Sequence, residues 1–189
     1  MVDLIIRNMA IIKSVRGYTP KIGKNCMVAE NATIVGNVEI GDDSSIWFGA
    51  VIRGDVNAIR IGKKCNIQDG ACLHATYDLS PHPSETILGD GVSVGHNAII
   101  HGAEIGDGCL IGMGATVLDN AKVGEGCIIA ANALVLSNAV LEPNGLYAGV
   151  PAKRLKEVTP EQRQNTLDRT TRDYMHYATW FPEYFTNKE

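Results

Sequence analysis

An aliphatic residue recurs at every sixth position along most of the chain, and this period limits the possible folds more than any other feature. Gly often follows the aliphatic residue, and the position four residues after it is small, as at Cys26, Ala32 and Ala50. A helix is excluded because glycine at this spacing would break it repeatedly. The aliphatic positions are Ile22, Val28, Ile34, Ile40, Ile46, Ile52, Ile61, Ile67, Leu73, Leu88, Val94, Ile100, Ile105, Ile111, Val117, Val123, Ile129 and Val135.

A period of six residues is explained by a chain in which each hexad forms one short strand and one turn. Three hexads close a triangular coil, and successive coils stack at about 4.8 Å, the spacing of neighbouring strands. A single hexad cannot bury its apolar face, so the coils are stable only as a stack. The period therefore predicts an all-β solenoid, a left-handed parallel β-helix of hexapeptide repeats, in a domain of residues 1–150.

Three interruptions of the period indicate where the chain departs from regular coils. Three extra residues lie between positions 52 and 61, nine extra between 73 and 88, and one residue is missing between 100 and 105. Binding and catalytic residues are often carried by loops that a rigid scaffold positions. We therefore expect the functional residues to lie near these interruptions.

The residues after the repeats predict a C-terminal α-helix. Thr159, Pro160 and Gln162 match an N-cap, a first-turn proline and the partner of a capping box. In a second segment, residues 151–189, we expect a helix over about 160–178 that lies along the coils or on a neighbouring subunit, and an aromatic tail that anchors it. The expected contacts are Leu167, Tyr174, Met175 and Tyr177 of the helix and Trp180, Phe181, Tyr184 and Phe185 of the tail.

Composition and charge exclude several classes of function. The net charge of −4 leaves no basic stripe for nucleic acid. No apolar run reaches membrane-spanning length, and residues 1–14 do not resemble a signal peptide, so we expect a cytoplasmic protein without a membrane partner. The five cysteines form no CxxC pair, which argues against a disulfide framework. Four of them occupy the small inward position of a hexad, where we expect them to be packing residues: Cys26, Cys65, Cys109 and Cys127.

Three of the five histidines, His74, His96 and His101, lie within the hexapeptide repeats. His74 and His101 each follow the aliphatic residue of a hexad and are separated by one complete coil, so their backbones should be adjacent and able to share a metal ion. His96 lies at another corner of its coil and cannot easily reach that ion within its own chain. In a threefold assembly, however, a neighbouring subunit can present it. Three histidines with an open fourth position are typical of catalytic zinc.

Further polar residues accompany these histidines. Arg53 stacks at the same corner as His74 and His101, and we expect Asp55, Gln68 and Asp69 to lie beside that column. An alternative is that all these groups are ordinary polar residues of a trimeric solenoid. Three histidines at compatible corners favour the metal site. We expect the remaining histidines, His82 and His176, to be solvated.

The motifs Arg53-Gly54-Asp55, Asn66-Ile67-Gln68-Asp69-Gly70, His74, Gly95-His96 and His101-Gly102 resemble those of the gamma-class carbonic anhydrases. The resemblance spans the β-helix and extends to the segment from Tyr147 to Lys153. It implies a homotrimer with Zn²⁺, or alternatively iron or cobalt, at each subunit interface, held by His74 and His101 of one subunit and His96 of the next. It also implies interface ion pairs of Arg53, Asp55 and Asp69, and candidate catalytic roles for Gln68, which would orient the metal-bound water, and for Asn66, Arg53 and Tyr147.

The implied activity is hydration of CO₂ to bicarbonate by a zinc-bound hydroxide. One departure from the family concerns export of the proton, because Val56 stands where the best-known members have Glu. The loop after His74 offers only Asp78, His82 and Glu85 for that task. Two alternatives stay open: an acyl-CoA thioesterase or acyltransferase on the same scaffold, and a non-catalytic trimeric scaffold with a retained metal site.

Overall fold

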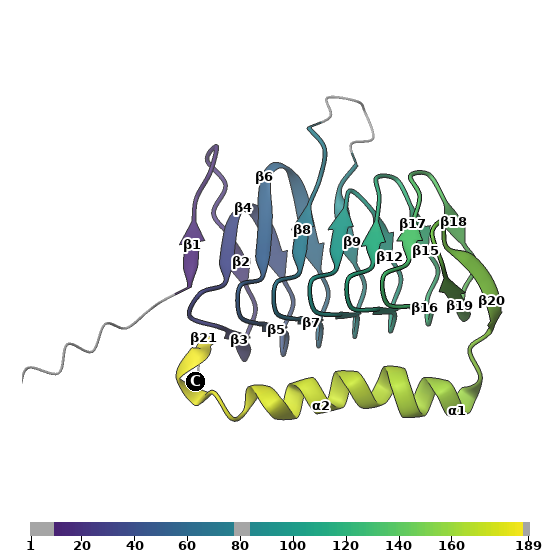
Figure 1. The fold of residues 1–189 in the computed structure, drawn as a ribbon. Coiled ribbons are helices and arrows are strands. Elements are labelled where there is room, and N and C mark those ends of the chain that lie inside the picture. Colours follow the sequence, from purple (N-terminus) through teal and green to yellow (C-terminus); the bar gives the residue numbers. More distant parts are fainter. Residues whose placement is uncertain (1–9, 78–83, 187–189) are drawn as a thin grey trace, which may run out of the picture.

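The hexads form a left-handed parallel β-helix of about seven turns with a single helical segment at its C-terminal end (Figure 1). The computed structural model describes residues 10–77 and 84–186. Each coil is a triangle, and its three sides stack into faces that we call I, II and III in chain order. This confirms the fold class that the six-residue period predicts.

Face I carries the strands that lead to the first corner of each coil. Its members pair in parallel, in register from Ile34 through Ile52 and Leu73 to Ile100, all of which are fully buried. Its strands are β1 (Ile11–Lys13), the first halves of β4 (Thr33–Ile40) and β6 (Val51–Ile61), β8 (Cys72–His74), β11 (Ile99–His101), β14 (Thr116–Val117) and β17 (Leu134–Val135).

Face II follows across the corner that we call edge I/II. The strands β4 and β6 continue around this edge and contribute their second halves to face II, where Ile61 pairs with Leu88. The other strands of face II are β2 (Lys21–Ile22), β9 (Thr86–Leu88), β12 (Glu104–Ile105), β15 (Lys122–Val123) and β18 (Val140–Leu141).

Face III completes each coil and meets face I at edge III/I. Its parallel strands are β3 (Cys26–Val28), β5 (Ser45–Ile46), β7 (Asn66–Ile67), β10 (Ser93–Val94), β13 (Leu110–Ile111), β16 (Ile128–Ile129) and β19 (Gly145–Ala148). Two antiparallel strands close its ends: β20 (Lys153–Glu157) pairs with β19, and β21 (Phe185–Thr186) pairs with β3. The sheet thus extends past residue 150, where we expected the β-helix domain to end.

The four cysteines expected as packing residues are buried. Each thiol donates to a backbone carbonyl of the next coil, as Cys65 does to Gly89 at 3.1 Å and Cys109 does to Gly124 at 3.1 Å. The cysteines therefore fill the interior corner and also help to join neighbouring coils.

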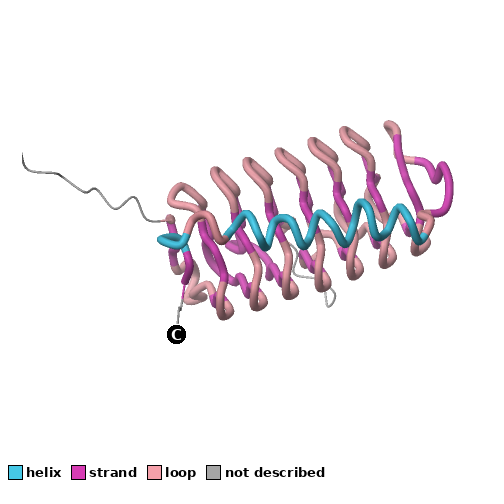
Figure 2. The backbone as a smooth tube through the Cα atoms, turned by 90° about the horizontal axis from the view of Figure 1, so that it is seen from below, coloured by secondary structure: helices cyan, strands magenta, loops and turns pink. Residues whose placement is uncertain are grey.

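The C-terminal helical segment runs the length of the stack along face III (Figures 1 and 2). It consists of α1 (Pro160–Gln162), a π-helical stretch (Arg163–Asp168) and α2 (Arg169–Ala178). The predicted capping box is present, since Thr159 Oγ1 accepts from Gln162 N at 3.2 Å and Gln162 Oε1 accepts from Thr159 N at 3.3 Å. The helix therefore starts where the sequence predicts.

Aromatic side chains anchor the far end of the helix. Tyr174 packs edge-on against Trp47 with ring centroids 5.3 Å apart, and Phe181 does so at 5.8 Å. Tyr177, Tyr184 and Phe185 join the same cluster, around Met27 and Ala178. Met175 and Trp180, which were also expected as contacts, are 37% and 62% exposed. Met175 borders a pocket together with Leu167 and Gly91, and Trp180 packs on Tyr177 with ring centroids 4.9 Å apart, so both contact the rest of the protein with only part of their surface.

Candidate metal centre

His74 and His101 meet at edge I/II on adjacent coils. Their Cα positions are partners in the β8–β11 ladder, and His74 Nδ1 lies 3.2 Å from His101 Nε2. The ladder register follows from the whole number of hexads between them, so the predicted stacking is confirmed. The two side chains are partly buried, with 16% of His74 and 28% of His101 exposed.

Each of these imidazoles turns its other nitrogen to a carboxylate. His74 Nε2 lies 3.0 Å from Asp55 Oδ1, and His101 Nδ1 lies 3.0 Å from both oxygens of Asp119. An ionised carboxylate only accepts, so the nitrogens facing it carry the protons. Arg53 Nη2, which only donates, approaches His74 Nδ1 at 3.3 Å. The two nitrogens that face each other therefore both present lone pairs.

The charges around Asp55 keep it ionised. Burial by itself would raise its pKa, but hydrogen bonds from Arg53, at 2.6 Å, and from His74 outweigh this and hold the pKa below its ordinary value. Burial and the charge of Arg53 lower the pKa of His74, against the opposing effect of Asp55. A neutral imidazole is the form that binds metal ions.

His96 lies at edge III/I, at the opposite side of face I. Its Nδ1 is 2.9 Å from Asp69 Oδ2, and its Nε2 is 3.2 Å from the hydroxyl of Tyr174 on α2. Burial raises the pKa of Tyr174 to about 12, and nearby Asp69 and Tyr177 add to the effect. The phenol thus stays protonated and donates to Nε2, while Nδ1–H points to Asp69.

The expectation that Gln68 and Asp69 lie beside the Arg53 column is wrong. Both residues follow Ile67, the last residue of β7, in the turn that leads to β8 on face I, so they lie at edge III/I with His96. Gln68 Nε2 donates to Asn66 Oδ1 at 2.9 Å, and Asn66 Nδ2 donates to Ser93 Oγ at 2.7 Å. This buried chain fixes the Gln68 amide and leaves its Oε1 as the acceptor.

The structure also places the remaining predicted residues. Tyr147 fills the interior of the last coil in register with Ile129, and its hydroxyl donates to the Glu142 carbonyl at 3.1 Å, so it does not join the histidines. His176 contacts the ring of Trp180 with centroids 5.5 Å apart. Asp78 and His82 lie outside the described residues.

The donor set at edge I/II fits a metal ion. Two nitrogens bound to one tetrahedral zinc at about 2.0–2.1 Å lie about 3.3 Å from each other, close to the 3.2 Å between His74 Nδ1 and His101 Nε2. Within residues 10–77 and 84–186 of a single chain, no three His, Cys, Asp or Glu side chains form a cluster that could hold a metal ion. One chain thus provides two of the three expected histidines at this point.

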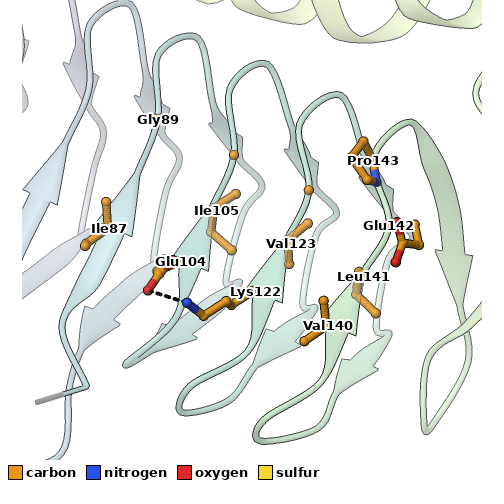
Figure 3. A pocket seen from close by; sticks show the side chains of 12 residues that line it. Ile87, Gly89, Glu104, Ile105, Lys122, Val123, Val140, Leu141, Glu142 and Pro143 are labelled. Atoms are coloured by element: carbon orange, nitrogen blue, oxygen red, sulfur yellow. Dashed lines mark ion pairs between the residues drawn. The ribbon is translucent and has the colours of Figure 1, made fainter. Parts of the chain in front are cut away.

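Of the cavities formed by the described residues, two illustrate how such spaces lie relative to the histidines. A pocket of about 260 Å³ borders Asp55 and is lined also by Arg16, Val56 and Glu85. A larger open groove of about 400 Å³ lies on face II, crossed by the ion pair of Lys122 and Glu104 at 3.3 Å (Figure 3). The groove is formed by β9, β12, β15 and β18, away from the histidines.

The sequence analysis missed Asp119 and the contact of Tyr174 with His96. The repeat could have located Asp119. Val117 pairs with Ile100 of the previous coil, and Asp119 lies two residues after Val117, near His101. No sequence signal locates Tyr174 against His96, since the six-residue period ends before the helix.

Comparisons with known proteins show which proteins this chain resembles. A family model described as bacterial transferase hexapeptide (six repeats) matches residues 19–54, 85–119 and 102–137. A Methanocaldococcus jannaschii protein named "Probable carbonic anhydrase" is 52% identical over 151 residues, which cover 80% of this chain and 92% of that protein. The chain belongs to the gamma-carbonic-anhydrase-like family of hexapeptide-repeat proteins.

Other members of the gamma-carbonic-anhydrase-like family carry different names. Protein YrdA of Escherichia coli is 39% identical over 92% of this chain and 94% of its own length. A solved Bacillus cereus structure, described provisionally as an acetyltransferase, is 40% identical with a TM-score of 0.85, covering 91% of this chain and 96% of that one. The chain spans 58% of the length of gamma carbonic anhydrase 2, mitochondrial, of Arabidopsis thaliana.

Among the described residues, no helix is long and apolar enough to cross a membrane.

Proposed function

We propose that the protein is a homotrimeric, metal-dependent carbonic anhydrase that hydrates CO₂ to bicarbonate. His74 and His101 of one subunit and His96 of a neighbouring subunit would hold Zn²⁺, with iron or cobalt as alternatives. The observation that carries this proposal is the pair of imidazole nitrogens that face each other 3.2 Å apart at edge I/II, with a third histidine at the other edge of the same face. Membership of the gamma-carbonic-anhydrase-like family supports it.

The character of face I supports the trimer. The residue that precedes each buried aliphatic position of face I faces outward and carries no charge, and Ile99 among them is 41% exposed: this column is Ile11, Thr33, Val51, Cys72, Ile99, Thr116 and Leu134. The equivalent column on face II is mostly charged: Lys21, Glu39, Arg60, Ile87, Glu104, Lys122 and Val140. A contiguous exposed apolar patch is typical of a protein–protein interface. If three copies of face I surround a threefold axis, edge III/I of one chain meets edge I/II of the next.

The chain's own residues would then prepare the site for hydration. Bound zinc supplies hydroxide at neutral pH because it lowers the pKa of water to about 7. Gln68, whose Nε2 is engaged by Asn66, would use Oε1 to orient water. The guanidinium of Arg53 would attract bicarbonate or pair with carboxylates across the interface, with Asp55 and Asp69 taking part. Glu85 borders the pocket beside Asp55 and, among the described residues of the loop after His74, would be the carboxylate to receive a proton.

Metal analysis and paired activity assays test the proposal. We expect protein purified without added metal to hold about one ion per chain, to catalyse CO₂ hydration and to leave thioesters intact. Thioester cleavage without CO₂ hydration would favour the acyl-CoA thioesterase. Bound metal with neither activity would favour the non-catalytic scaffold. The cytoplasmic location stays a prediction, and cell fractionation of the source organism would test it.

A further inference from the structure

Asp119 lies directly against one of the proposed metal ligands. Both of its carboxylate oxygens are 3.0 Å from Nδ1 of His101, and the two side chains are 26% and 28% exposed. Asp119 comes from the next coil, just after Val117, whose backbone pairs with Ile100. The contact therefore joins two neighbouring coils at edge I/II.

A shortened corner brings this carboxylate to the ring. One residue is missing between Ile100 and Ile105, and the chain turns there at Gly102, which has a φ of +59°. A Cβ on Gly102 would collide with Asp119 Oδ1, so the carboxylate occupies space that only glycine leaves open. Asn120 N also donates to the Gly102 carbonyl at 2.6 Å, which holds the two coils together at this point.

The contact determines which nitrogen of His101 carries the proton. A carboxylate accepts but does not donate, so Nδ1 is the protonated nitrogen and Nε2 keeps its lone pair. Nε2 of His101 lies 3.2 Å from Nδ1 of His74. Histidines that bind metal ions often donate their other N–H to a carboxylate, which fixes the tautomer and the ring orientation.

We propose that Asp119 is a positioning residue that holds His101 in the tautomer whose Nε2 can accept a metal ion, and that the missing residue at Gly102 exists to admit it. This inference rests on the proposed metal centre. Asp119 touches neither of the other two histidines in the single chain, so its effect passes through His101.

The test compares Asp119→Ala with Asp119→Asn and with Asp107→Ala. The control residue Asp107 also lies at a corner, but it accepts from the backbone N–H of Asp90 at 2.8 Å. Nitrogen-15 NMR of histidine-labelled, metal-free trimer reads the tautomer of His101. Competition with a chelator reads the affinity for zinc.

We expect Asp119→Ala to change the His101 spectrum from the Nδ1–H form to a mixture and to weaken zinc binding about 10- to 100-fold. Asp119→Asn keeps an accepting oxygen, so it should restore part of the Nδ1–H form of His101 and part of the zinc affinity. Asp107→Ala should change neither the tautomer nor the affinity. Unchanged tautomer and affinity in Asp119→Ala would overturn the inference, provided that His101→Ala loses zinc. If His101→Ala also kept zinc, the metal centre itself would be wrong. Should Asp119→Ala not fold, Asp119→Leu, which keeps a similar side-chain volume without an accepting atom, decides by the same two measurements: a wild-type tautomer and a wild-type zinc affinity would overturn the inference.

Discussion

The hydroxyl of Tyr174 lies 3.2 Å from Nε2 of His96, although the two residues are 78 positions apart in the chain. The contact exists because α2 packs along face III, where Tyr174 also meets the ring of Trp47. In the single chain, the tyrosine therefore occupies the lone pair that His96 would offer to a metal ion.

Replacing Tyr174 by Phe should strengthen metal binding. The phenol competes for Nε2 of His96 with a hydrogen bond of about 0.5–1.5 kcal/mol, so its removal should raise zinc affinity about 2- to 10-fold. Chelator competition measures this, with Tyr177→Phe on the same helix as the control. Weaker zinc binding in Tyr174→Phe would show that the hydroxyl supports the metal site instead.

Substitution of Ile99 by Arg should break the trimer. Ile99 faces outward from face I and is 41% exposed, and three buried guanidinium groups near one axis would lack partners. Sedimentation velocity should show monomers. Ile87→Arg is a matched control, because Ile87 is 37% exposed on face II and should leave the assembly intact. If Ile87→Arg gave monomers and Ile99→Arg stayed trimeric, the subunit interface would lie on face II and not on face I.

Mixed trimers test the origin of the third ligand. We expect His96→Ala alone and His74→Ala alone to lose metal at every site. When the two variants are unfolded and refolded together, some interfaces should combine intact His74 and His101 of one chain with intact His96 of the other, and metal content should partly return. Failure of any metal to return, in trimers shown to be mixed, would mean that the ligands do not come from different subunits.

The pairing of Asp55 predicts how stability depends on pH. Although burial opposes it, hydrogen bonding from Arg53 and His74 lowers the pKa of Asp55, so the folded state favours its ionised form. The resulting stabilisation is present above the ordinary pKa of about 3.9 and is lost as pH falls through the lower folded value. Urea unfolding of the metal-free protein should therefore show a loss of stability in acid that Asp55→Asn reduces. Identical pH dependence in both proteins would contradict the pairing.

Cys65 should be inert in the folded protein. Burial raises its pKa to about 12 from the ordinary 9.0, so at pH 8 its thiolate fraction falls about a thousandfold. Mass spectrometry after iodoacetamide treatment should find Cys65 unmodified in native protein and modified after unfolding. Rapid native labelling would show that the interior corner opens readily.

The six-residue period by itself determined the coils and the register in which the residues at their corners stack. Because each hexad is one side of a triangle, counting whole coils places His74 beside His101, and backbone pairing leaves no freedom to slip. The same counting assigns His96 to a different edge. The expected position of Gln68 and Asp69 was wrong because these residues follow β7, a strand of face III, and so lie at edge III/I, whereas Arg53 lies at edge I/II.

Only the tertiary structure decided which groups surround these histidines. The docking of the helix depends on side-chain packing between distant segments, which no period describes, so the contact of Tyr174 with His96 appears only in three dimensions. The approach of Asp119 to His101 likewise depends on the path of a shortened corner around Gly102. Backbone hydrogen bonds specify neighbours from spacing alone, whereas side-chain contacts at corners depend on shapes that form only when the coils are stacked.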